Sequence, residues 1–166
     1  IRPDESVLVR APLFMSDGEI RDFVSRHMRW IETHLARVRA ENTVAKDAEK
    51  LTEEEVRALA EKAARVIPRR AEYFAPIIGV KYGKITIRAQ KTIWGSCTAC
   101  GNLSFNCLLM LAPPEVVDSV VVHELCHIKQ MNHSQEFYDE VLRVFPRYYE
   151  CRNWLKENGR KILRRR

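Results

Sequence analysis

The chain has 166 residues, of which 46% are hydrophobic, and its formal net charge at pH 7 is +6. This size supports one substantial hydrophobic core with a small appended part. No apolar run approaches the roughly 18 residues that a membrane-spanning helix needs, so we expect no membrane partner. No signal peptide is visible, but the first residue is not Met, so we expect upstream sequence to be missing.

Residues 1–50 are typical of a short strand followed by one long helix. Val7-Leu8-Val9-Arg10 has strand composition. Ser16-Asp17-Gly18-Glu19 has the S-x-x-E form of a capping box and predicts the start of an amphipathic helix. His27 and His34 lie on this helix among apolar neighbours, which indicates ordinary packing rather than a metal site. Apolar residues at helical spacing predict the core face of the helix: Ile20, Phe23, Val24, Trp30, Ile31, Leu35 and Val38.

The polar stretch 41–50 lacks an apolar stripe, so it is either a loop or an extension of the first helix. A second capping box at Thr52-Glu53-Glu54-Glu55 predicts a new helix, which Pro68 kinks or ends. We therefore divide the chain into residues 1–50, the N-terminal strand and long helix, and residues 51–166, the main domain.

The middle of the chain predicts a small antiparallel sheet. Lys84–Arg88 alternates with the period of a strand, and 92–94 and 103–105 flank a glycine-containing loop, as in a hairpin. The loop also holds Cys97 and Cys100. A zinc ribbon needs a second such pair, which the sequence lacks, so these two are interpreted as hairpin thiols. Five scattered cysteines, an odd number, suit a reducing cytoplasm better than a disulfide framework.

His123-Glu124-Leu125-Cys126-His127 is an H-E-x-x-H sequence, the pattern in which two histidines hold Zn²⁺ beside a glutamate base. On a helix the two histidines share a face, about 5–6 Å apart at Cβ. On a strand they would be roughly 13 Å apart, too far to share an ion. Chance produces such a match in roughly one chain in a hundred of this composition. The valine-rich stretch before the motif also falls on one arc of a helix, so we predict a buried helix with one functional edge.

His133 is the remaining histidine close to this motif. Catalytic zinc usually has three protein ligands and one open position for water, which makes His133 the candidate third ligand. It can turn back on the metal only if the helix ends soon after His127, for which Asn132 offers a left-handed conformation. Asn132 or Ser134 then caps the next helix. The spacing matches metzincins, but Gln130 replaces their glycine and no Met-turn follows, so we predict a zincin of another kind.

The positive charge is concentrated at the end of the chain. Residues 152–166 hold seven basic residues and one acidic residue, whereas the charges of the other 151 residues sum to zero. A basic tail can contact phosphates, but a solvated chain end explains it as well. The rest of the chain has no net charge, so it gives no electrostatic argument for a nucleic-acid partner.

Four segments together are similar to the YgjP-like metallopeptidase family, a bacterial relative of the SprT-like zinc peptidases: Trp94–Cys97, Leu111–Glu115, Val121–His127 and Asn132–Ser134. The resemblance covers nearly the whole chain. It implies an α+β, zincin-like fold in which the active-site helix packs beside a small antiparallel sheet, with an N-terminal strand-helix extension. It also implies one Zn²⁺ per chain on His123, His127 and His133, with Glu124 as the catalytic residue. Cys100 and the pair Phe137-Tyr138 depart from the family pattern.

The function that follows is hydrolysis of a peptide or protein substrate by a water that zinc and Glu124 activate. Trp94, Gly95 and Ser96 are candidates to bind extended substrate at a sheet edge, although Trp94 is equally typical of a core residue. Tyr138, Tyr148 and Tyr149 are candidates to stabilise the oxyanion. One alternative is a zinc hydrolase of another amide or ester. The other is a non-catalytic binding module whose fold is held together by zinc and which contacts nucleic acid. In that module Glu124 would have no role.

Overall fold

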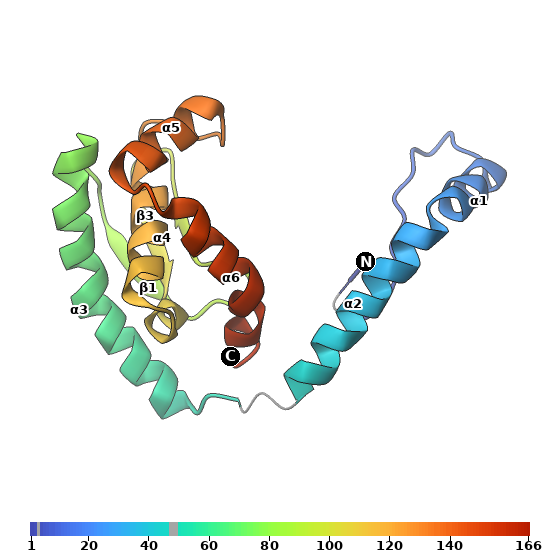
Figure 1. Ribbon diagram of the computed structural model, residues 1–166, viewed down its shortest axis with the longest axis horizontal. Coiled ribbons are helices and arrows are strands. Elements are labelled where there is room, and N and C mark those ends of the chain that lie inside the picture. Colours follow the sequence, from blue (N-terminus) through green and yellow to red (C-terminus); the bar gives the residue numbers. More distant parts are fainter. Residues whose placement is uncertain (3, 47–49) are drawn as a thin grey trace. The chain divides into compact units, whose positions relative to one another are not determined.

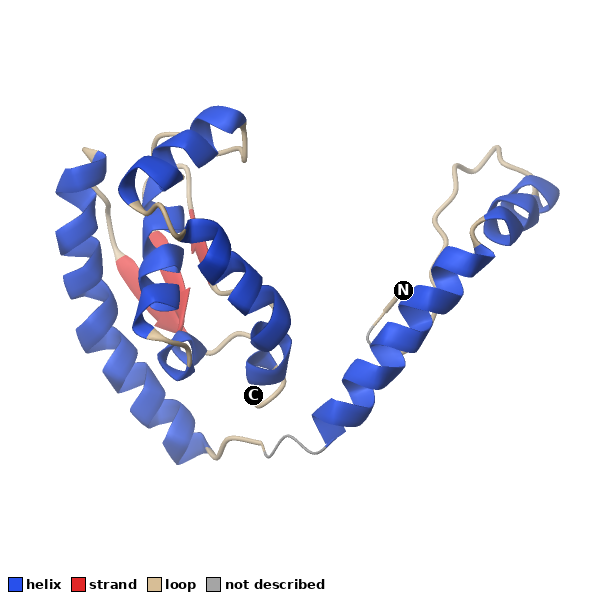
Figure 2. Cartoon of the chain, viewed as in Figure 1, coloured by secondary structure: helices blue, strands red, loops and turns tan. Residues whose placement is uncertain are grey.

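The computed structural model describes residues 1–2, 4–46 and 50–166, apart from the side chains of residues 41–46. The chain divides into two compact units, Ile1–Glu49 and Lys50–Arg166, and each is considered by itself. Helices dominate both units, and the strands belong to the second (Figures 1 and 2). In the described ranges no helix combines the length and the apolar character that crossing a membrane requires.

The first unit contains the helices α1 (Asp17–Arg26) and α2 (Met28–Lys46). The predicted capping box is present, because Ser16 Oγ accepts from the Glu19 N–H and the Glu19 carboxylate accepts from the Ser16 N–H. The expected single helix is interrupted at His27, the C-cap of α1. Part of the polar stretch, 41–46, continues α2, and positions 47–49 lie outside the described residues.

Two expectations for the first unit are wrong. Residues 7–10 form no strand, since no second strand in the described part of this unit can pair with them. The predicted core face of the helix is largely uncovered: Phe23 and Trp30 are 48% and 55% exposed, and of the unit's described apolar side chains Ile31 alone is buried. Two successive helices lack a second layer that would cover this face.

The second unit begins with the long helix α3 (Glu53–Ile78). A capping box between Thr52 and Glu55 starts it, as predicted, and Gly79 ends it in the left-handed conformation at φ 80°. The helix continues through Pro68 and Pro76, each of which costs about 3 kcal/mol. Its buried face outweighs this cost, since a large buried apolar side chain contributes about 1.5–3 kcal/mol. That face consists of Val56, Ala63, Ile67, Ala71, Phe74, Ala75 and Ile78.

The sheet has the order β1-β3-β2, with β1 (Ile85–Arg88), β2 (Gly95–Cys97) and β3 (Leu103–Asn106). The hairpin partners β2 and β3 are antiparallel, as expected, but β1 pairs with β3 in parallel, so the sheet is mixed rather than purely antiparallel. The short helical turn η1 (Cys107–Leu111) follows β3 and is buried over most of its length.

Residues 92–94 do not extend β2 as predicted but belong to a loop, and the Asn106 side chain binds this loop. This side chain is fully buried. The amide nitrogen donates to the carbonyls of Gln90 and Ile93 at 2.7 and 2.9 Å, and the amide oxygen accepts from the Leu108 N–H. This one side chain therefore satisfies two carbonyls of the loop before β2. It also fixes the loop that places Trp94 directly before β2.

Three further helices complete the unit: α4 (Pro114–Cys126), α5 (Gln135–Val144) and α6 (Tyr148–Leu163). Helix α4 is the central element, because it contacts α3, α5, α6 and β2. It is the predicted buried helix, with the valine-rich stretch inside the core. Figure 1 shows α3 along one side of the unit, with the sheet between α3 and α6.

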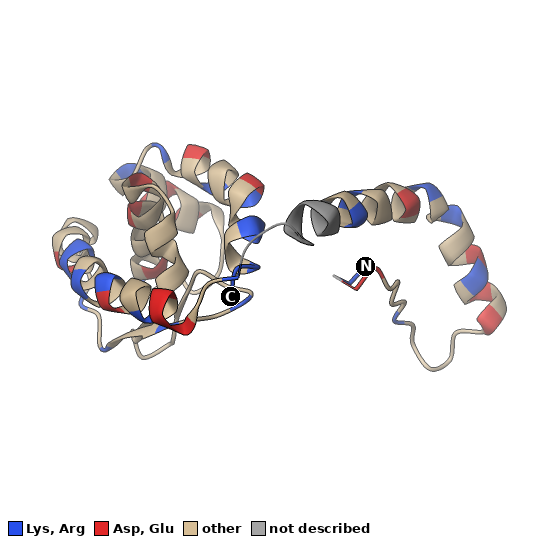
Figure 3. Ribbon diagram, turned by 90° about the horizontal axis from the view of Figure 1, so that it is seen from below, with Lys and Arg blue, Asp and Glu red and all other residues tan. Residues whose placement is uncertain are grey.

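The basic C-terminal stretch folds back on the start of α3 instead of extending freely. The Leu51 N–H donates to the Arg165 carbonyl at 2.8 Å, and the Lys50 ammonium donates to the carbonyls of Arg164 and Arg166. Figure 3 shows Lys and Arg gathered where the chain ends. These contacts fix the backbone at the end of α6.

Candidate functional site

Three histidines meet at the end of α4. His123 Nε2 lies 3.1 Å from His127 Nε2 and 3.2 Å from His133 Nε2. Ligands held at about 2.0–2.1 Å by one tetrahedral ion are about 3.3–3.4 Å from each other, so these spacings fit a single zinc-sized ion. The available donor atoms of the three residues all lie within 4.8 Å of one another. The structure thus brings together all three histidines that the sequence singles out.

The chain turns at the predicted place, but the backbone contact that ends the helix is not the predicted one. Helix α4 ends at Cys126, with His127 as its C-cap, and Ser134 caps α5 by accepting from the Phe137 N–H. Asn132 is not left-handed as expected, since Glu5 is the one non-glycine residue with positive φ in the described chain. The Gln130 N–H instead donates to the Cys126 carbonyl, which closes the last turn.

Neighbouring groups orient two of the imidazoles. The Gln130 carbonyl lies 3.0 Å from His127 Nδ1. A carbonyl only accepts, so Nδ1 carries the proton and Nε2 is left with a free lone pair. His123 Nδ1 lies 2.8 Å from the Tyr148 hydroxyl, and when this hydroxyl accepts from Nδ1–H, the Nε2 lone pair is free for a metal.

Burial keeps the same imidazoles neutral, as metal binding requires. Desolvation, followed by the nearby His127, His133 and Arg152, lowers the pKa of His123 to about 3. Desolvation also lowers the pKa of His127, although the Gln130 carbonyl opposes this effect. Neither histidine therefore needs to lose a proton to bind a cation at neutral pH.

Phe137 lies against all three imidazoles. Its ring centre is 4.9 Å from that of His123, 4.5 Å from that of His127 and 5.0 Å from that of His133. The side chain is fully buried, so it forms a rigid apolar wall that limits how far the rings can turn. Its position on the apolar face of α5, together with Val141, is the sequence signal that could have identified it.

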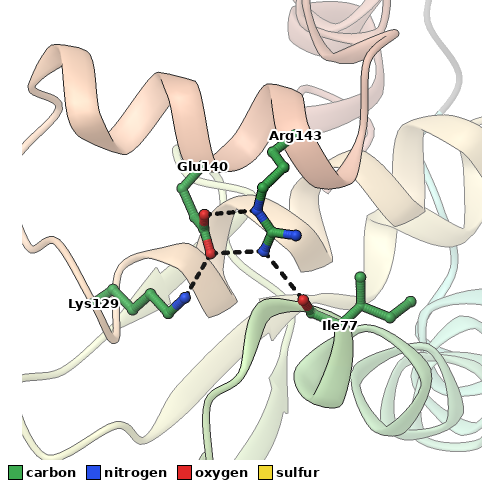
Figure 4. A network of polar contacts seen from close by, with 4 residues as sticks. All are labelled: Ile77, Lys129, Glu140 and Arg143. Carbon is green, nitrogen blue, oxygen red and sulfur yellow. Dashed lines mark hydrogen bonds and ion pairs between the residues drawn. The ribbon is translucent and has the colours of Figure 1, made fainter.

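A polar network ties the chain turn to the rest of the unit (Figure 4). The Lys129 ammonium donates to Glu140 at 2.6 Å, and the Arg143 guanidinium donates to both oxygens of the same carboxylate at 2.9 Å. Arg143 Nη2 also donates to the Ile77 carbonyl at the end of α3. Because Lys129 follows His127 and Glu140 lies on α5, the network connects the segments on both sides of His133.

We expect Glu140→Gln to destabilise the fold by about 1 kcal/mol at pH 7, the scale of a solvent-screened ion pair. Lys129 and Arg143 are 40% and 51% exposed, which keeps the value small. Hydrogen bonds from Arg143 and then Lys129 lower the pKa of Glu140 from 4.5 to about 2. The contribution is therefore complete above pH 4.5 and is lost as the pH falls toward 2.

Urea unfolding at pH 7 and at pH 3 measures this effect. The stability difference between Glu140→Gln and the wild type should narrow at the lower pH. Glu157→Gln, at an exposed position on α6, serves as the matched control and should leave both curves unchanged. An equal difference at both pH values would show that the carboxylate charge does not stabilise the turn.

Glu124 is a buried carboxyl group beside the three histidines, only 5% exposed. Burial raises its pKa to about 8 in the metal-free protein. A cation bound by the adjacent imidazoles would favour the ionised form and lower this pKa again. The group is thus suited to accept and return a proton near neutral pH.

Gly95 on β2 makes room for the Glu124 side chain. A Cβ atom at position 95 would lie 2.6 Å from Glu124 Oε1, 2.7 Å from Cγ and 2.8 Å from Cδ. All three distances are shorter than real Cβ contacts. The backbone of β2 therefore approaches the carboxyl group as closely as it does only because residue 95 has no side chain.

A cavity of about 300 Å³ opens next to Glu124, between α4, α6 and the loop that leads to β2. Trp94 and Gly95 line it, together with His123 and Glu124. Ser96, which pairs with Ser104 in the sheet, does not line it. Of the three residues predicted to contact substrate, two thus lie at the cavity. Trp94 is half-buried, as befits a wall of the cavity rather than a residue of the central core.

The three candidate tyrosines occupy different positions. Tyr148 is buried and its hydroxyl contacts Nδ1 of His123, on the side of the ring away from the other two histidines. Tyr138 stacks on His133 at 6.2 Å. Tyr149 is 45% exposed, and among the described ring contacts it meets Tyr138 and Tyr148 but no imidazole. Of the three tyrosines, Tyr148 thus contacts an imidazole through its hydroxyl, and Tyr138 contacts one through its ring.

Comparisons with known proteins identify a family from one match and a fold from two others. A family model described as "YgjP-like, metallopeptidase domain" matches residues 1–57 and 41–158. The metallopeptidase zymogen abylysin of Pyrococcus abyssi is 24% identical, with a TM-score of 0.52 over 57% of this chain and 97% of that one. The metallopeptidase zymogen jannalysin of Methanocaldococcus jannaschii is 20% identical, with a TM-score of 0.50 over 56% and 96%. No curated protein sequence matches the chain. The structural likenesses confirm the predicted α+β, zincin-like fold.

Proposed function

The chain belongs to the YgjP-like metallopeptidase family, whose activity is the metal-dependent hydrolysis of peptide bonds, and on this premise we propose that it is a zinc peptidase with Glu124 as its general base. The observation that carries the proposal is the convergence of three Nε2 atoms, two of the separations being 3.1 and 3.2 Å, beside a buried carboxyl group. All of these residues lie in the Lys50–Arg166 unit, which we propose as the catalytic domain.

His123, His127 and His133 are the proposed metal ligands. Three neutral imidazoles are typical of catalytic zinc, which keeps one position open. When bound there, zinc would polarise the scissile carbonyl and make the attacking water more acidic. A non-catalytic zinc site usually has four protein ligands, and among the described residues no fourth His, Cys, Asp or Glu joins this cluster. This supports a catalytic rather than a purely structural site.

Glu124 is the proposed base and later the acid. Its carboxylate takes a proton from the attacking water, and it then returns a proton to the leaving amine. Because His123 and Glu124 are adjacent in α4, the carboxyl group is held beside the ligands by the helix backbone. Gly95 packs against the same carboxyl group from β2, which supports a fixed position for the base.

We propose that extended substrate pairs with the free edge of β2. This strand lies at the end of the sheet order, and within the described part of the chain it pairs with β3 alone. The Trp94 carbonyl accepts from Asn106 and the Thr98 N–H donates to Asn102. Since the hydrogen-bonding direction alternates along a strand, the backbone of Gly95 faces the free edge, next to Glu124. An added peptide strand would thus lie beside the base.

Tyr138 is the strongest of the three candidates for a hydroxyl that stabilises the oxyanion. It stacks on His133, and no hydrogen bond engages its hydroxyl among the described contacts. The Tyr148 hydroxyl already contacts His123, so we propose that Tyr148 positions this ligand instead.

Metal removal and replacement test the proposed function directly. We expect the protein treated with chelator to lose hydrolysis of a denatured protein substrate, and one equivalent of Zn²⁺ to restore it. Metal content is measured by mass spectrometry alongside the release of new amino termini. Cleavage that persists in the metal-free protein, or a small amide or ester cut in place of any peptide, would contradict the proposal.

Gly95→Ala tests the contact between β2 and the base. The added methyl group forces the whole Glu124 side chain to move, because Cγ and Cδ are as close as the terminal oxygen. A displacement of about 1 Å can cost about 10²-fold in rate, so we expect kcat to fall by about 10- to 100-fold with the metal retained. Gly18→Ala is the control, since a Cβ there meets nothing closer than Ser16 Oγ at 3.8 Å. Unchanged kcat in Gly95→Ala would show that this contact does not position the base.

A further inference from the structure

The cavity beside Glu124 is mainly apolar but contains one permanent cation. Ile93, Trp94, Val120 and Leu155 contribute apolar walls, and Arg152 of α6 contributes the positive charge. Among the described residues that line it there is no other Lys or Arg. A cavity of this kind accepts an apolar side chain or backbone together with one anionic group.

The spacing of residues along α6 places Arg152 on the cavity side of the helix. Tyr148, Arg152 and Leu155 stand at i, i+4 and i+7, and all three line the cavity. Gly159 continues the same face, where a Cβ atom would lie 3.0 Å from the Trp94 ring. The Trp94 indole therefore packs against α6 at Gly159. It forms the wall of the cavity opposite Arg152.

Unlike three other arginines of this unit, Arg152 has no carboxylate partner among the described residues. Arg70 binds Asp118, Arg143 binds Glu140 and Arg147 binds Glu150, whereas no acidic group of the described chain lies within ion-pair distance of Arg152. Its guanidinium carbon lies 5.8 Å from the centre of the Tyr138 ring. The aromatic face holds the guanidinium in place without using its N–H donors.

This position is close to the proposed site of hydrolysis. Tyr138, beneath the guanidinium, stacks on His133, and Arg152 lines the same cavity as His123 and Glu124. A peptide paired with the edge of β2 would pass between Gly95 and α6, within reach of a side chain as long as arginine. The five N–H donors form a planar fork that matches a carboxylate.

Resting on the proposed peptidase function, we propose that Arg152 selects substrates that carry a carboxylate next to the scissile bond. The carboxylate belongs either to an Asp or Glu side chain or to the carboxyl terminus of the peptide. One charge-assisted hydrogen bond corresponds to about 10- to 100-fold in kcat/KM. Because Arg152 is exposed, the preference should weaken as the ionic strength rises.

Paired peptide libraries with blocked termini test the first source of the carboxylate. One position at a time carries Glu in one library and Gln in the other, and mass spectrometry identifies the cut bond. We expect the zinc-loaded protein to cleave the Glu peptides about 10- to 100-fold more efficiently when Glu flanks that bond. A second pair, with a free or an amidated carboxyl terminus, tests the other source. A preference in either pair supports the proposal, and equal cleavage in both pairs overturns it.

Variants of Arg152 assign the preference to this residue. Arg152→Gln should bring the Glu-to-Gln ratio close to one, and Arg152→Glu should favour Lys over Glu at the same position. Lys156→Gln removes an exposed cation of α6 that does not line the cavity, and it should leave the ratio unchanged. If Arg152→Gln slows both peptides by the same factor, the residue acts on the reaction itself and the proposal is overturned.

Binding provides a readout without turnover. Calorimetric titration of the same peptides into the Glu124→Gln protein should show tighter binding of the carboxylate peptide, with a dependence on Arg152 that matches the kinetics. Equal affinities for Glu and Gln peptides would contradict the proposal. If the zinc-loaded wild type cleaves no peptide of either library, the proposed function fails as well, and this outcome is distinct from cleavage without preference.

Discussion

We expect Glu124→Gln to lower kcat for peptide hydrolysis by about 10²- to 10⁴-fold, the range that general acid–base catalysis contributes, while the protein still binds one zinc ion. Gln has the shape of Glu, so the packing against Gly95 is retained, but it cannot accept a proton from water. The three imidazoles are untouched, which preserves the metal. The variant should be at least as stable as the wild type, because the site buries the carboxyl group and raises its pKa to about 8.

Three measurements separate the role of Glu124 from indirect effects. Metal content shows whether the site is loaded, thermal unfolding reports the fold, and single-turnover kinetics report the chemical step. Glu61→Gln on an exposed face of α3 is the matched control and should behave as the wild type. A loaded, folded Glu124→Gln protein that still cleaves at the wild-type rate would eliminate Glu124 as the base.

The second large effect is expected for His133→Ala, which should weaken zinc binding by about 10²- to 10³-fold. Structural zinc sites contribute about 10–16 kcal/mol, so one of four ligands accounts for about 2.5–4 kcal/mol. His133 is the exposed member of the three and lies outside the helices, at the turn between α4 and α5. Its loss should therefore leave the metal-free fold intact.

Competition with a chromophoric chelator measures the zinc affinity of His133→Ala. His27→Ala, in the first unit, removes a histidine that does not belong to the cluster and should bind zinc as the wild type does. Activity of His133→Ala should return at zinc concentrations raised by the same factor as the dissociation constant. An unchanged dissociation constant would exclude His133 as a ligand.

Local sequence patterns predicted the elements that carry the three candidate ligands. The helix with His123 and His127 follows from the spacing of four, because helical periodicity depends only on near neighbours. The capping boxes that start α1 and α3, and the cap at Ser134, are likewise present as expected. The family resemblance drawn from the motifs is also confirmed by the match to the family model.

Structural features that depend on contacts between distant residues were predicted less well. Residues 7–10 have strand composition but form no strand, since composition alone does not supply a pairing partner. Pro68 does not end α3, because packing against the core outweighs the local cost. The left-handed turn expected at Asn132 is replaced by backbone contacts from Gln130.

The sequence by itself determined the metal-binding pattern, the helix that presents it and the turn that brings His133 back, because all three depend on residues close together in the chain. Only the tertiary structure decided what surrounds them. Gly95 meets Glu124, Tyr148 contacts His123 and Arg152 enters the same cavity. These pairs are more than 20 residues apart, and no local periodicity encodes which of them meet. Their contacts result from the burial of α4 between the sheet and α6, which places distant side chains around one carboxyl group.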